Sequence, residues 1–266
     1  MTSERRANQP NGYRDRNSTA ERALEILMMF GEQRPSVTAS EVAGYLDVAR
    51  STAYRYIQSL TNAGFLEEGA SGGFQLGPRI LELAHIARRS GSLAEYARPV
   101  MRQLASATGE TVLLTRLTGH TAFCVDRADA VQRVMRLSYE PGQTLPVNAG
   151  AGAYVLLAWL PETEVDQIIA HVAFEAFTAN TITTASGLKK KLKETRRLGF
   201  AVSRAELDLD VVGIAAPIRD SADRVVAALS VAASASRVSD RDVPGLAKAV
   251  VGSAELVTAR LRLIEV

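Results

Sequence analysis

Hydrophobic residues recur at helical spacing between residues 50 and 62, and this segment organises the first third of the chain. Ala53, Ile57 and Leu60 fall on one face of the expected helix, while polar side chains occupy the opposite face. The helix is expected to end at Gly64, because glycine adopts the left-handed conformation that closes many helices. The pattern therefore predicts an amphipathic helix whose apolar face is turned toward a core.

A shorter amphipathic stretch over residues 38–46 lies immediately before this helix. Thr38 followed by Glu41 forms a capping box, in which each side chain satisfies an unpaired amide of the first turn. A further helix is expected over residues 18–30, again with a serine and a glutamate three residues apart at its start. Three helices are therefore predicted, the last two of them joined by a tight turn.

Two short apolar runs follow the third helix and flank a glycine-rich turn. Residues 65–66 and 74–76 form the runs, and Ser-Gly-Gly at residues 71–73 forms the turn, which together favour a β-hairpin. Helices followed by such a hairpin make a winged helix-turn-helix. We expect this domain to cover residues 18–77.

The outward face of the helix over residues 50–62 is a candidate DNA-reading surface. Its side chains are uncharged or positive and rich in hydrogen-bonding groups, which suits a helix lying in the major groove. An alternative stays open from these residues alone: two core helices with a solvated outer face, since any helical hairpin shows an apolar stripe. The hairpin carries Glu67 and Glu68 and no basic residue, so the charge for DNA contact must come from Arg50 and Arg55 on the helix. The candidate face comprises Ser51, Thr52, Tyr54, Arg55 and Gln58.

The segments on either side of this domain are an arm and a linker. Residues 1–17 are polar, with several arginines, and are predicted to be a disordered basic arm that either follows phosphates or is a passive tail. Pro78 suits the first position of a linker helix over residues 78–92, which could pack against its copy in a partner chain. Its inward-facing residues are expected to be Ile80, Leu81, Ala84 and Ala87.

From residue 93 onward the pattern changes to helices mixed with the strands of an antiparallel sheet. The predicted fold class is therefore α+β, with a second domain over residues 93–266. Helices are expected over residues 93–107, over the apolar stretch before Pro161, and over 162–172, 187–198 and 239–263. Strands are expected over residues 112–117, 122–126, 131–137, 200–204, 211–218 and 225–232.

Composition bounds the classes of function. Hydrophobic residues make up 47% of the 266 residues, enough for two cores, and a net charge of only +2 means that any basic surface must be local. The single cysteine excludes an internal disulfide, and the chain has neither an apolar leader nor an apolar run of about 18 residues. We therefore expect a cytoplasmic protein that does not enter a membrane.

Signals of catalysis and metal binding are weak, and no catalytic residue, metal ligand or cofactor is predicted. Cys124 and His120 lie four residues apart without a third partner, so a buried thiol is the favoured interpretation. The sequence has no nucleotide-binding fingerprint, and its histidines lack the spacing of a metal site. The glycine-rich run over residues 150–152 favours close helix–sheet packing, with backbone amides directed at a ligand as the alternative. The basic run over residues 189–197 is interpreted as the solvated face of a helix whose leucines point inward.

Several stretches after residue 17 occur in an order that matches one known family. They are STAERALEILMMF at 18–30, STAYRYIQSLTNAGFLE at 51–67, FQLGPRILELA at 74–84, TGETVLL at 108–114, LPVNAGAGAYVLLAWLP at 145–161, AELDLDVVGIAAPIRD at 205–220 and VVAALSVAAS at 225–234. On these stretches the chain resembles the IclR-type bacterial transcriptional regulators.

This resemblance implies a winged helix-turn-helix joined by a helix to a GAF-like domain that binds an effector. It also implies homodimers, often paired as tetramers, a double-stranded DNA operator, and a small organic effector held against the sheet of the second domain. By position, the recognition role falls on Arg50, Ser51, Thr52, Tyr54, Arg55 and Tyr56. The effector pocket falls on Asn148, Ala149, Gly150, Ala151, Gly152, Ala153, Glu206, Gly213, Ser230 and Ala232.

Four positions depart from the pattern of the family. Ala153 and Tyr154 stand where the family usually has glycine and a basic residue, and Gly213 stands where many members have cysteine or serine. Ala232 stands where some members that bind small oxo-acids have a second serine. Each change removes a polar contact or adds bulk. The sequence therefore favours an effector less polar than a two-carbon acid, either aromatic or longer-chained.

We expect a regulator that responds to a ligand and is not an enzyme, in which a dimer reads a near-palindromic operator through the helix over residues 50–62. A rival hypothesis is a metabolite-binding module or enzyme whose winged helix serves only for dimerisation. A third is an architectural DNA binder without a ligand. Salt-dependent DNA binding separates the first hypothesis from the second, because neutralising phosphates releases counterions.

Overall fold

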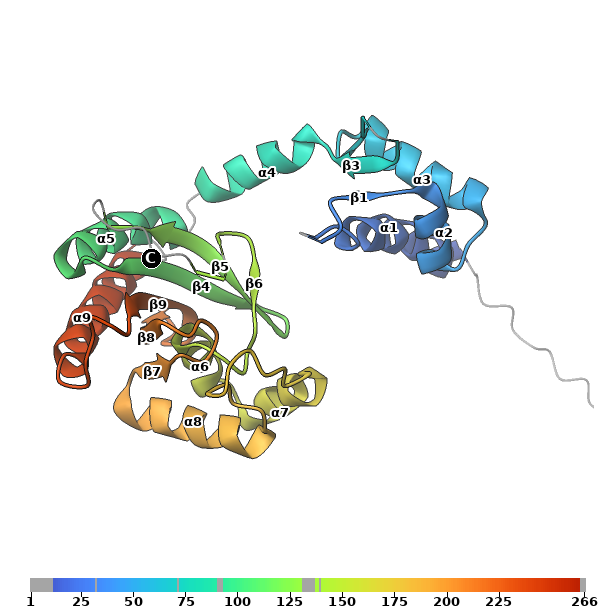
Figure 1. Ribbon diagram of the computed structural model, residues 1–266. Helices are drawn as coiled ribbons and strands as arrows, with labels where there is room; N and C mark the ends of the chain where they lie inside the picture. Colours follow the sequence, from blue (N-terminus) through green and yellow to red (C-terminus); the bar gives the residue numbers. More distant parts are fainter. Residues whose placement is uncertain are drawn as a thin grey trace, which may run out of the picture. The chain divides into compact units, whose positions relative to one another are not determined.

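The computed structural model divides the chain into two compact units, unit 1 (Met1–Ser90) and unit 2 (Gly91–Val266) (Figure 1). The residues that the structure describes are 12–31, 33–70, 72–89, 93–130, 137–138 and 140–263. Each unit has its own cluster of buried hydrophobic side chains, so each is described by itself.

Unit 1 is a helical domain that carries a small antiparallel sheet. The sheet has three strands in the order β1-β3-β2, and the last two form the hairpin. The two helices predicted over residues 38–46 and 50–62, and the hairpin after them, are confirmed. The elements are α1 (Gly12–Met28), β1 (Ser36–Val37), α2 (Ala39–Leu46), α3 (Arg50–Asn62), β2 (Leu66–Glu68), β3 (Phe74–Leu76) and α4 (Pro78–Arg89).

Local hydrogen bonds fix the ends of the helical pair as the sequence predicts. At the start of α2, Thr38 Oγ1 accepts from the Glu41 amide at 3.3 Å, and Glu41 Oε2 accepts from the Thr38 amide at 2.7 Å. After α3 the chain turns at Gly64, whose φ is +76°. The apolar face of α3 is fully inside the domain, because Ala53 and Ile57 have no exposed surface.

The helix α1 begins earlier than the sequence predicts. Residues 12–17 belong to α1, so the prediction of a disordered arm over 1–17 is wrong for that part, and its remainder lies outside the described residues. The C-terminal half of α1 is anchored by Ile26, which is 0% exposed, and Met29 directly after the helix is 8% exposed. Once the C-terminal half of α1 has formed, each residue added toward the N-terminus gains a backbone hydrogen bond without a new nucleation cost. The helix therefore extends into the polar residues 12–17.

The linker helix α4 begins at Pro78 as predicted, but its apolar side chains are not all inside. Leu81 is 71% exposed and Ile86 is 53% exposed, so the prediction that Leu81 faces inward is wrong. The buried cluster of unit 1, among the described residues, draws on α1, α2, α3 and the sheet and includes no α4 residue. The apolar side chains of Leu81 and Ile86 therefore do not pack in the buried cluster of unit 1. The side chain of Ala87 lies outside the described residues.

Unit 2 is built on a six-stranded antiparallel sheet with the order β6-β5-β4-β9-β8-β7. β4 pairs with β5 on one side and with β9 on the other, and β9 also pairs with β8. Strands far apart in the sequence therefore lie side by side at the centre of the sheet. The elements are α5 (Leu93–Thr108), β4 (Thr111–Thr118), β5 (Thr121–Ala128), β6 (Thr144–Leu145), α6 (Ala151–Ala158), α7 (Glu162–His171), α8 (Ala185–Leu198), β7 (Ala201–Arg204), β8 (Val211–Arg219), β9 (Val225–Ser234) and α9 (Val243–Arg262).

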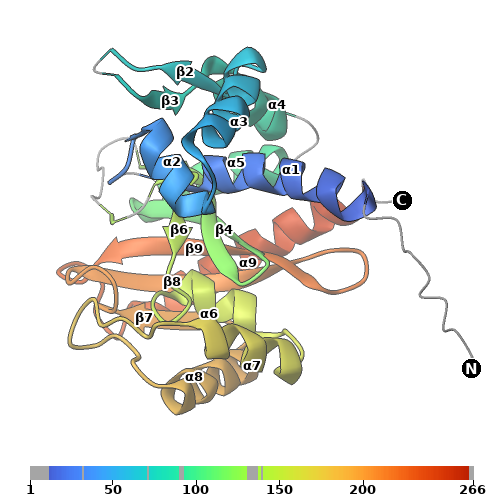
Figure 2. The ribbon, with the colours of Figure 1, turned by 90° about the vertical axis from the view of Figure 1, so that its right-hand side faces the viewer.

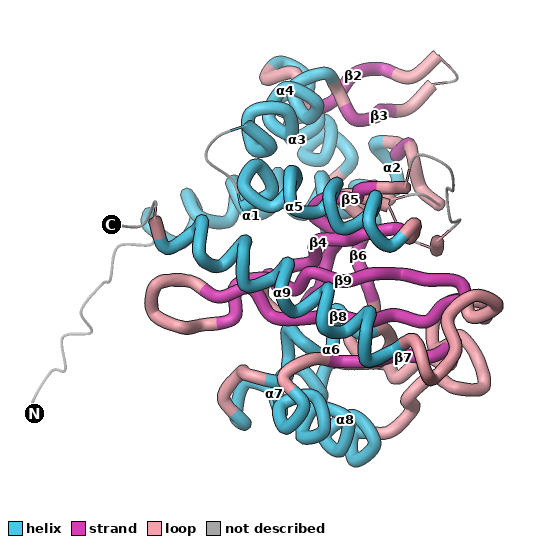
Figure 3. Tube along the Cα trace, turned by 90° about the vertical axis from the view of Figure 1, so that its left-hand side faces the viewer, coloured by secondary structure: helices cyan, strands magenta, loops and turns pink. Residues whose placement is uncertain are grey.

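Helices cover both faces of this sheet. α5 and α9 pack on one face, and α9 crosses in front of β8 and β9 in Figure 3. α6 packs on the other face and is backed by α8, beside α7, as Figure 2 shows. With both faces covered, β8 and β9 read as nearly continuous buried runs instead of an alternation of apolar and polar residues. The predicted α+β class with a flanked antiparallel sheet is confirmed.

Side-chain alternation along the central strands sends alternate residues to the two cores. Ile214 and Val231 join the core under α5 and α9, whereas Ala215 and Ala232 join the core under α6. The neighbouring polar positions Thr115 and Ser230 therefore face α6 as well. This register is what gathers small and polar side chains beneath the start of α6.

The predicted elements of unit 2 are largely confirmed, and the helix expected over 93–107 continues across Pro99 in α5. There are two differences: α9 begins at Val243 instead of residue 239, and the short strand β6 was not expected. The strand predicted over 131–137 falls mostly outside the described residues, and Leu137 itself lies outside any strand. Among the described residues, the helices are all too short or too polar to cross a lipid bilayer.

Candidate functional site

Unit 1 presents a polar surface along α3. The outward side chains are held in place because Ala53, Ile57 and Leu60 fix the opposite face in the core. Ala49 precedes the helix and provides no side-chain cap, so the first amides of α3 are left for water or a phosphate. The exposed members of the predicted DNA-reading set are Arg50, Ser51, Tyr54, Arg55 and Gln58.

The remaining members of that set are less accessible. Thr52 is partly buried, and Tyr56 packs against the buried cluster of unit 1. Tyr54 is 47% exposed and meets Phe74 of the hairpin edge-on, with ring centroids 6.2 Å apart. Tyr54 therefore links α3 to the hairpin while keeping its outer part free.

The hairpin contributes acidic side chains and no basic one among its described residues, 66–70 and 72–76. Glu67 and Glu68 are both exposed, and Glu67 Oε1 accepts a hydrogen bond from Gln75 Nε2 at 2.7 Å. This bond holds one carboxylate on the sheet surface but leaves its charge in place. Among the described residues of α3 and the hairpin, the basic side chains are Arg50 and Arg55.

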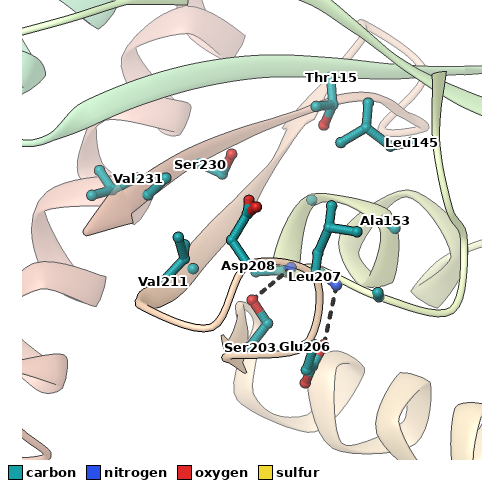
Figure 4. Close-up of a pocket in the computed structure, with 16 residues that line it drawn as sticks. Thr115, Leu145, Ala153, Ser203, Glu206, Leu207, Asp208, Val211, Ser230 and Val231 are labelled. Carbon is teal, nitrogen blue, oxygen red and sulfur yellow. Dashed lines mark hydrogen bonds between the residues drawn. The ribbon is translucent and has the colours of Figure 1, made fainter. Parts of the chain in front are cut away.

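Unit 2 contains a pocket between the start of α6 and the sheet, where most of the predicted effector residues come together (Figure 4). The cavity measures about 30 Å³, which is room for a water-sized molecule. Asn148 does not line it, because its Nδ2 donates to the carbonyls of Glu175 and Ile182 at 3.0 and 2.9 Å. The predicted residues that line the pocket are Ala149, Gly150, Ala151, Gly152, Ala153, Glu206, Gly213, Ser230 and Ala232.

Side chains from β7 and the following loop cap the first amides of α6. Glu206 Oε2 accepts from the Gly150 amide, and Ser203 Oγ accepts from the Ala151 amide, both at 3.1 Å. The amides of residues 152–153 have no acceptor among the described residues. Because the positive end of the helix dipole lies at the same place, this corner of the pocket can hold an anion.

Gly213 on β8 makes the cap by Ser203 possible. A Cβ atom at residue 213 would lie 2.5 Å from Ser203 Oγ and 3.4 Å from the Ala151 Cβ. Any larger residue would therefore push the Ser203 hydroxyl away from α6. The departure of Gly213 from the family pattern and the presence of Ser203 are thus complementary.

A buried polar cluster lies behind this cap. Tyr154 is fully buried, and its hydroxyl donates to Glu206 Oε2 at 2.5 Å and lies 3.1 Å from the Asn148 carbonyl. Burial raises the pKa of Glu206, although the bond from Tyr154 opposes the shift. Burial and the neighbouring carboxyl also raise the pKa of Tyr154. Lys191 of α8 lies over the Tyr154 ring, with Nζ 5.9 Å from the ring centroid.

Sequence reasoning missed several pocket residues. Ser203 and Thr115 reach the pocket through strand register, which only the pairing of distant strands reveals. Leu207 and Asp208 follow Glu206 in a loop and extend into the space between α6 and the sheet in Figure 4. In the strand predicted over 200–204, Ser203 shares a face with Ala201, which the structure places in the core on the α6 side. Among the residues that the structure describes, those that line the pocket include no basic one.

The groups considered for catalysis or metal binding do not form a site. Cys124 is buried without exposed surface, and His120 lies in the turn before β5. The rings of His120 and His171 are 5.3 Å apart, although the two residues lie far apart in the sequence. Within the described part of the chain, no three histidine, cysteine or acidic side chains are grouped as metal ligands would be.

Cys124 is expected to resist alkylation in the folded protein. Burial raises the pKa of its thiol to about 12, so near pH 8 only about one molecule in ten thousand is a thiolate. Mass spectrometry after treatment with iodoacetamide should show no adduct in native protein and complete modification in urea. Native labelling as fast as that of free cysteine would contradict a structural thiol.

Comparison with family models decides the class of this protein. The IclR helix-turn-helix domain matches residues 19–69, and the IclR C-terminal domain of bacterial transcriptional regulators matches residues 86–259. The chain belongs to the IclR family. This family consists of DNA-binding transcriptional regulators with a ligand-binding C-terminal domain.

Individual IclR relatives cover nearly the whole chain. The HTH-type transcriptional regulator XynR of Escherichia coli (strain K12) is 28% identical over 227 residues, which is 85% of this chain and 89% of XynR. The crystal structure of an IclR regulator from Silicibacter sp. TM1040 is 27% identical, with a TM-score of 0.82 over 91% of this chain and 96% of that one. An IclR homologue from Microbacterium hydrocarbonoxydans, crystallised with 4-hydroxybenzoate, shares the fold at 24% identity, with a TM-score of 0.76 over 91% of this chain and 98% of that one.

Proposed function

We propose that this IclR-family chain binds a near-palindromic DNA operator as a homodimer, or as a pair of dimers. A small organic acid that binds in unit 2 releases the protein from the operator or alters how the protein is bound to it. The observation that carries the DNA-binding half is the face of α3, where exposed Arg50, Ser51 and Arg55 stand opposite a fully buried apolar stripe. Operator DNA lies in the bacterial cytoplasm, so we place the protein there. We assign residues 18–77 to DNA binding, 78–92 to the linker and 93–266 to effector binding.

The dimer supplies two copies of α3, which would enter successive major grooves about 34–36 Å apart or a multiple of that distance. Leu81 and Ile86 on α4 support a partner chain, because both are largely exposed and apolar. Effector binding can control such a dimer only if the effector prefers one arrangement of the linker helices over another.

The chemistry of the pocket supports a carboxylic acid as effector. Free amides at residues 152–153 and the hydroxyl of Ser230 offer hydrogen-bond donors to a carboxylate, while Leu145 and Val211 offer apolar surface. The loop that carries Leu207 and Asp208 lines the same pocket. The apolar lining favours an aromatic or longer-chain acid, such as the 4-hydroxybenzoate bound by the Microbacterium homologue.

Changing Arg55 to alanine should weaken specific operator binding by about 1–3 kcal/mol per half-site, because a guanidinium that reads guanine makes two hydrogen bonds to the base edge. The measurement is an electrophoretic mobility shift with the promoter region of the protein's own gene. Arg22 of α1, which pairs with Glu25, provides the matched control, and Arg22→Ala should leave specificity unchanged. Equal affinity and equal specificity of Arg55→Ala and wild type would remove Arg55 from the base-reading surface.

A cognate acid should raise the melting temperature of unit 2. A ligand present at about 100 times its dissociation constant adds about 2.7 kcal/mol of stability, which corresponds to several degrees for a domain of this size. Thermal shift assays with benzoate, 4-hydroxybenzoate, longer-chain acids, glyoxylate and pyruvate provide the comparison. We expect the aromatic or longer acids to raise it most. A large shift with glyoxylate or pyruvate alone would contradict the less polar effector.

A further inference from the structure

The cluster of Tyr154, Glu206 and the Asn148 carbonyl has too few hydrogens if Glu206 is ionised. The Tyr154 hydroxyl has one hydrogen but lies within hydrogen-bond distance of both Glu206 Oε2 and the Asn148 carbonyl oxygen. With Glu206 ionised, the single Tyr154 hydrogen serves only one of the two acceptors. Either the Asn148 carbonyl loses this donor, or Glu206 Oε2 keeps the Gly150 amide alone, and either loss costs free energy in a buried site.

Adding one proton to Glu206 satisfies every group in the cluster. The protonated Glu206 then donates to the Tyr154 oxygen, and the Tyr154 hydroxyl donates to the Asn148 carbonyl. The Gly150 amide still donates to Glu206 Oε2 at 3.1 Å. The geometry therefore fits a neutral carboxylic acid at residue 206 better than a carboxylate.

The free donors of the pocket lie immediately beside this carboxyl group. The amides of residues 152–153 begin roughly 3 Å further along the axis of α6 than the Gly150 amide that Glu206 caps. Ser230, 6% exposed, lines the same pocket, and its hydroxyl has no hydrogen-bond partner among the described residues. A carboxylate bound to these donors would lie against Glu206, and two charged carboxylates that close disfavour each other strongly.

We propose that Glu206 makes the pocket selective for anions by being protonated whenever an acid effector is bound, so that binding to the form with ionised Glu206 takes up one proton. This proposal rests on the proposed function, in which the effector is a carboxylic acid. Glu206 acts here as a positioning and charge-setting residue that lies beside the effector.

The backbone around Glu206 is built to keep its side chain in this place. Ala205 has a φ of +51°, a left-handed conformation that is unfavourable for alanine. Hydrogen bonds from the adjoining segment hold it, since Thr178 Oγ1 donates to the Ala205 carbonyl at 2.5 Å and Thr181 Oγ1 donates to the Glu206 carbonyl at 2.6 Å. Strain of this kind persists where surrounding contacts fix it, and it marks functional segments.

The charged groups around Glu206 do not neutralise it. Among the described residues, Lys191 of α8 is a cation that acts on Glu206, and its Nζ pairs with Glu194 at 3.2 Å. Arg204, which precedes Glu206 in the chain, pairs with Asp240. Asp208 lies on the same loop and adds a further negative group to the pocket, and its carboxylate accepts from Ser138. Burial outweighs these neighbours and raises the pKa of Glu206.

The sign of the pH dependence follows from this arrangement. The pKa of Glu206 is raised in the free protein, and an adjacent bound carboxylate raises it further. Affinity for the anionic effector is therefore highest below the pKa of Glu206 in the free protein. It falls as the pH rises between that pKa and the pKa in the complex, by up to about tenfold per pH unit.

Calorimetric titration of the full-length protein with benzoate tests the proposal. Benzoate is fully ionised above about pH 5.5, so any change in affinity from there to about pH 8.5 reports on the protein. We expect the wild-type affinity to fall with rising pH, and buffers of different ionisation enthalpy should show uptake of a proton. Glu206→Gln keeps the neutral shape and should bind with an affinity independent of pH. The exposed Glu255 of α9 provides the control, since Glu255→Gln should keep the wild-type slope.

Each other outcome has a definite meaning. Binding of benzoate to wild type with constant affinity would overturn the proton coupling and leave the proposed function intact. Loss of binding in a folded Glu206→Gln variant would show that the ionised carboxylate is needed, and would also overturn it. Failure of benzoate to bind either protein at any pH would overturn both this proposal and the aromatic-acid effector.

A second measurement covers the case in which Glu206→Gln does not fold. Carboxyl carbon-13 NMR of wild-type protein labelled at glutamate should show one resonance that titrates above the exposed glutamates and moves upward again when benzoate is added. If every glutamate titrates in the range of the exposed ones, Glu206 is ionised in the free pocket and the proposal is wrong.

Discussion

Replacing Gly213 with serine is expected to weaken effector binding strongly while DNA binding persists. The new Cβ would stand 2.5 Å from Ser203 Oγ, so the Ser203 hydroxyl must leave the Ala151 amide that it caps. A buried amide left without an acceptor costs about 1–3 kcal/mol, and the added bulk costs a similar amount. Together these should weaken effector binding by at least about 2 kcal/mol, or roughly thirtyfold.

Calorimetry with the acid that raises the melting temperature most is the measurement for Gly213→Ser. Gly245 in α9 provides a matched control, because a Cβ there meets nothing within 4 Å. Gly245→Ser should keep the wild-type affinity. Retention of wild-type affinity by Gly213→Ser would show that the cap by Ser203 contributes nothing to the pocket.

Changing Ile57 to alanine should unfold unit 1 near room temperature while unit 2 stays folded. Ile57 has no exposed surface and lies at the centre of the apolar face of α3. Removing such a side chain costs about 2–5 kcal/mol, and a domain of this size has only about that much stability to lose. DNA binding should be lost together with the fold of the winged helix.

Differential scanning calorimetry separates the two units in this experiment. We expect wild type to show a transition for each unit and Ile57→Ala to lack the one for unit 1. Ser59 is exposed on the same helix, and Ser59→Ala should change its stability by less than about 0.5 kcal/mol. A full unit 1 transition in Ile57→Ala, at the wild-type temperature, would contradict the packing of α3 described here.

Elements with a strong local cause could be predicted from the sequence. The capping box of Thr38 and Glu41, the turn at Gly64 and the apolar spacing of Ile57 each depend on neighbours within a few residues. The start of α1 could not be predicted, because its polar first turns extend from a C-terminal half that is held by tertiary packing. The strand β6 could not be predicted either, because its two residues are a strand only through their pairing with β5.

The pocket shows the same limit. Its glycine-alanine loop and Glu206 came from the family resemblance, and the structure brings them together. Ser203 and Thr115 could not be placed, because they reach the pocket only through the register of strands far apart in sequence. The hydrogen bond of Tyr154 could not be predicted either, since the sequence showed only that tyrosine stands where the family usually has a basic residue. In the folded chain its hydroxyl meets Glu206, and Lys191 from another helix lies over its ring.

The most direct test of a DNA-reading α3 is fluorescence anisotropy with the protein's own promoter DNA over a range of salt concentrations. We predict that the logarithm of the binding constant falls linearly with the logarithm of the salt concentration, since each neutralised phosphate releases counterions. Arg55→Ala should bind promoter DNA less tightly than wild type and discriminate less against unrelated DNA. Absence of DNA binding by the wild-type protein even at low salt, or equal affinity for every sequence, would contradict the account.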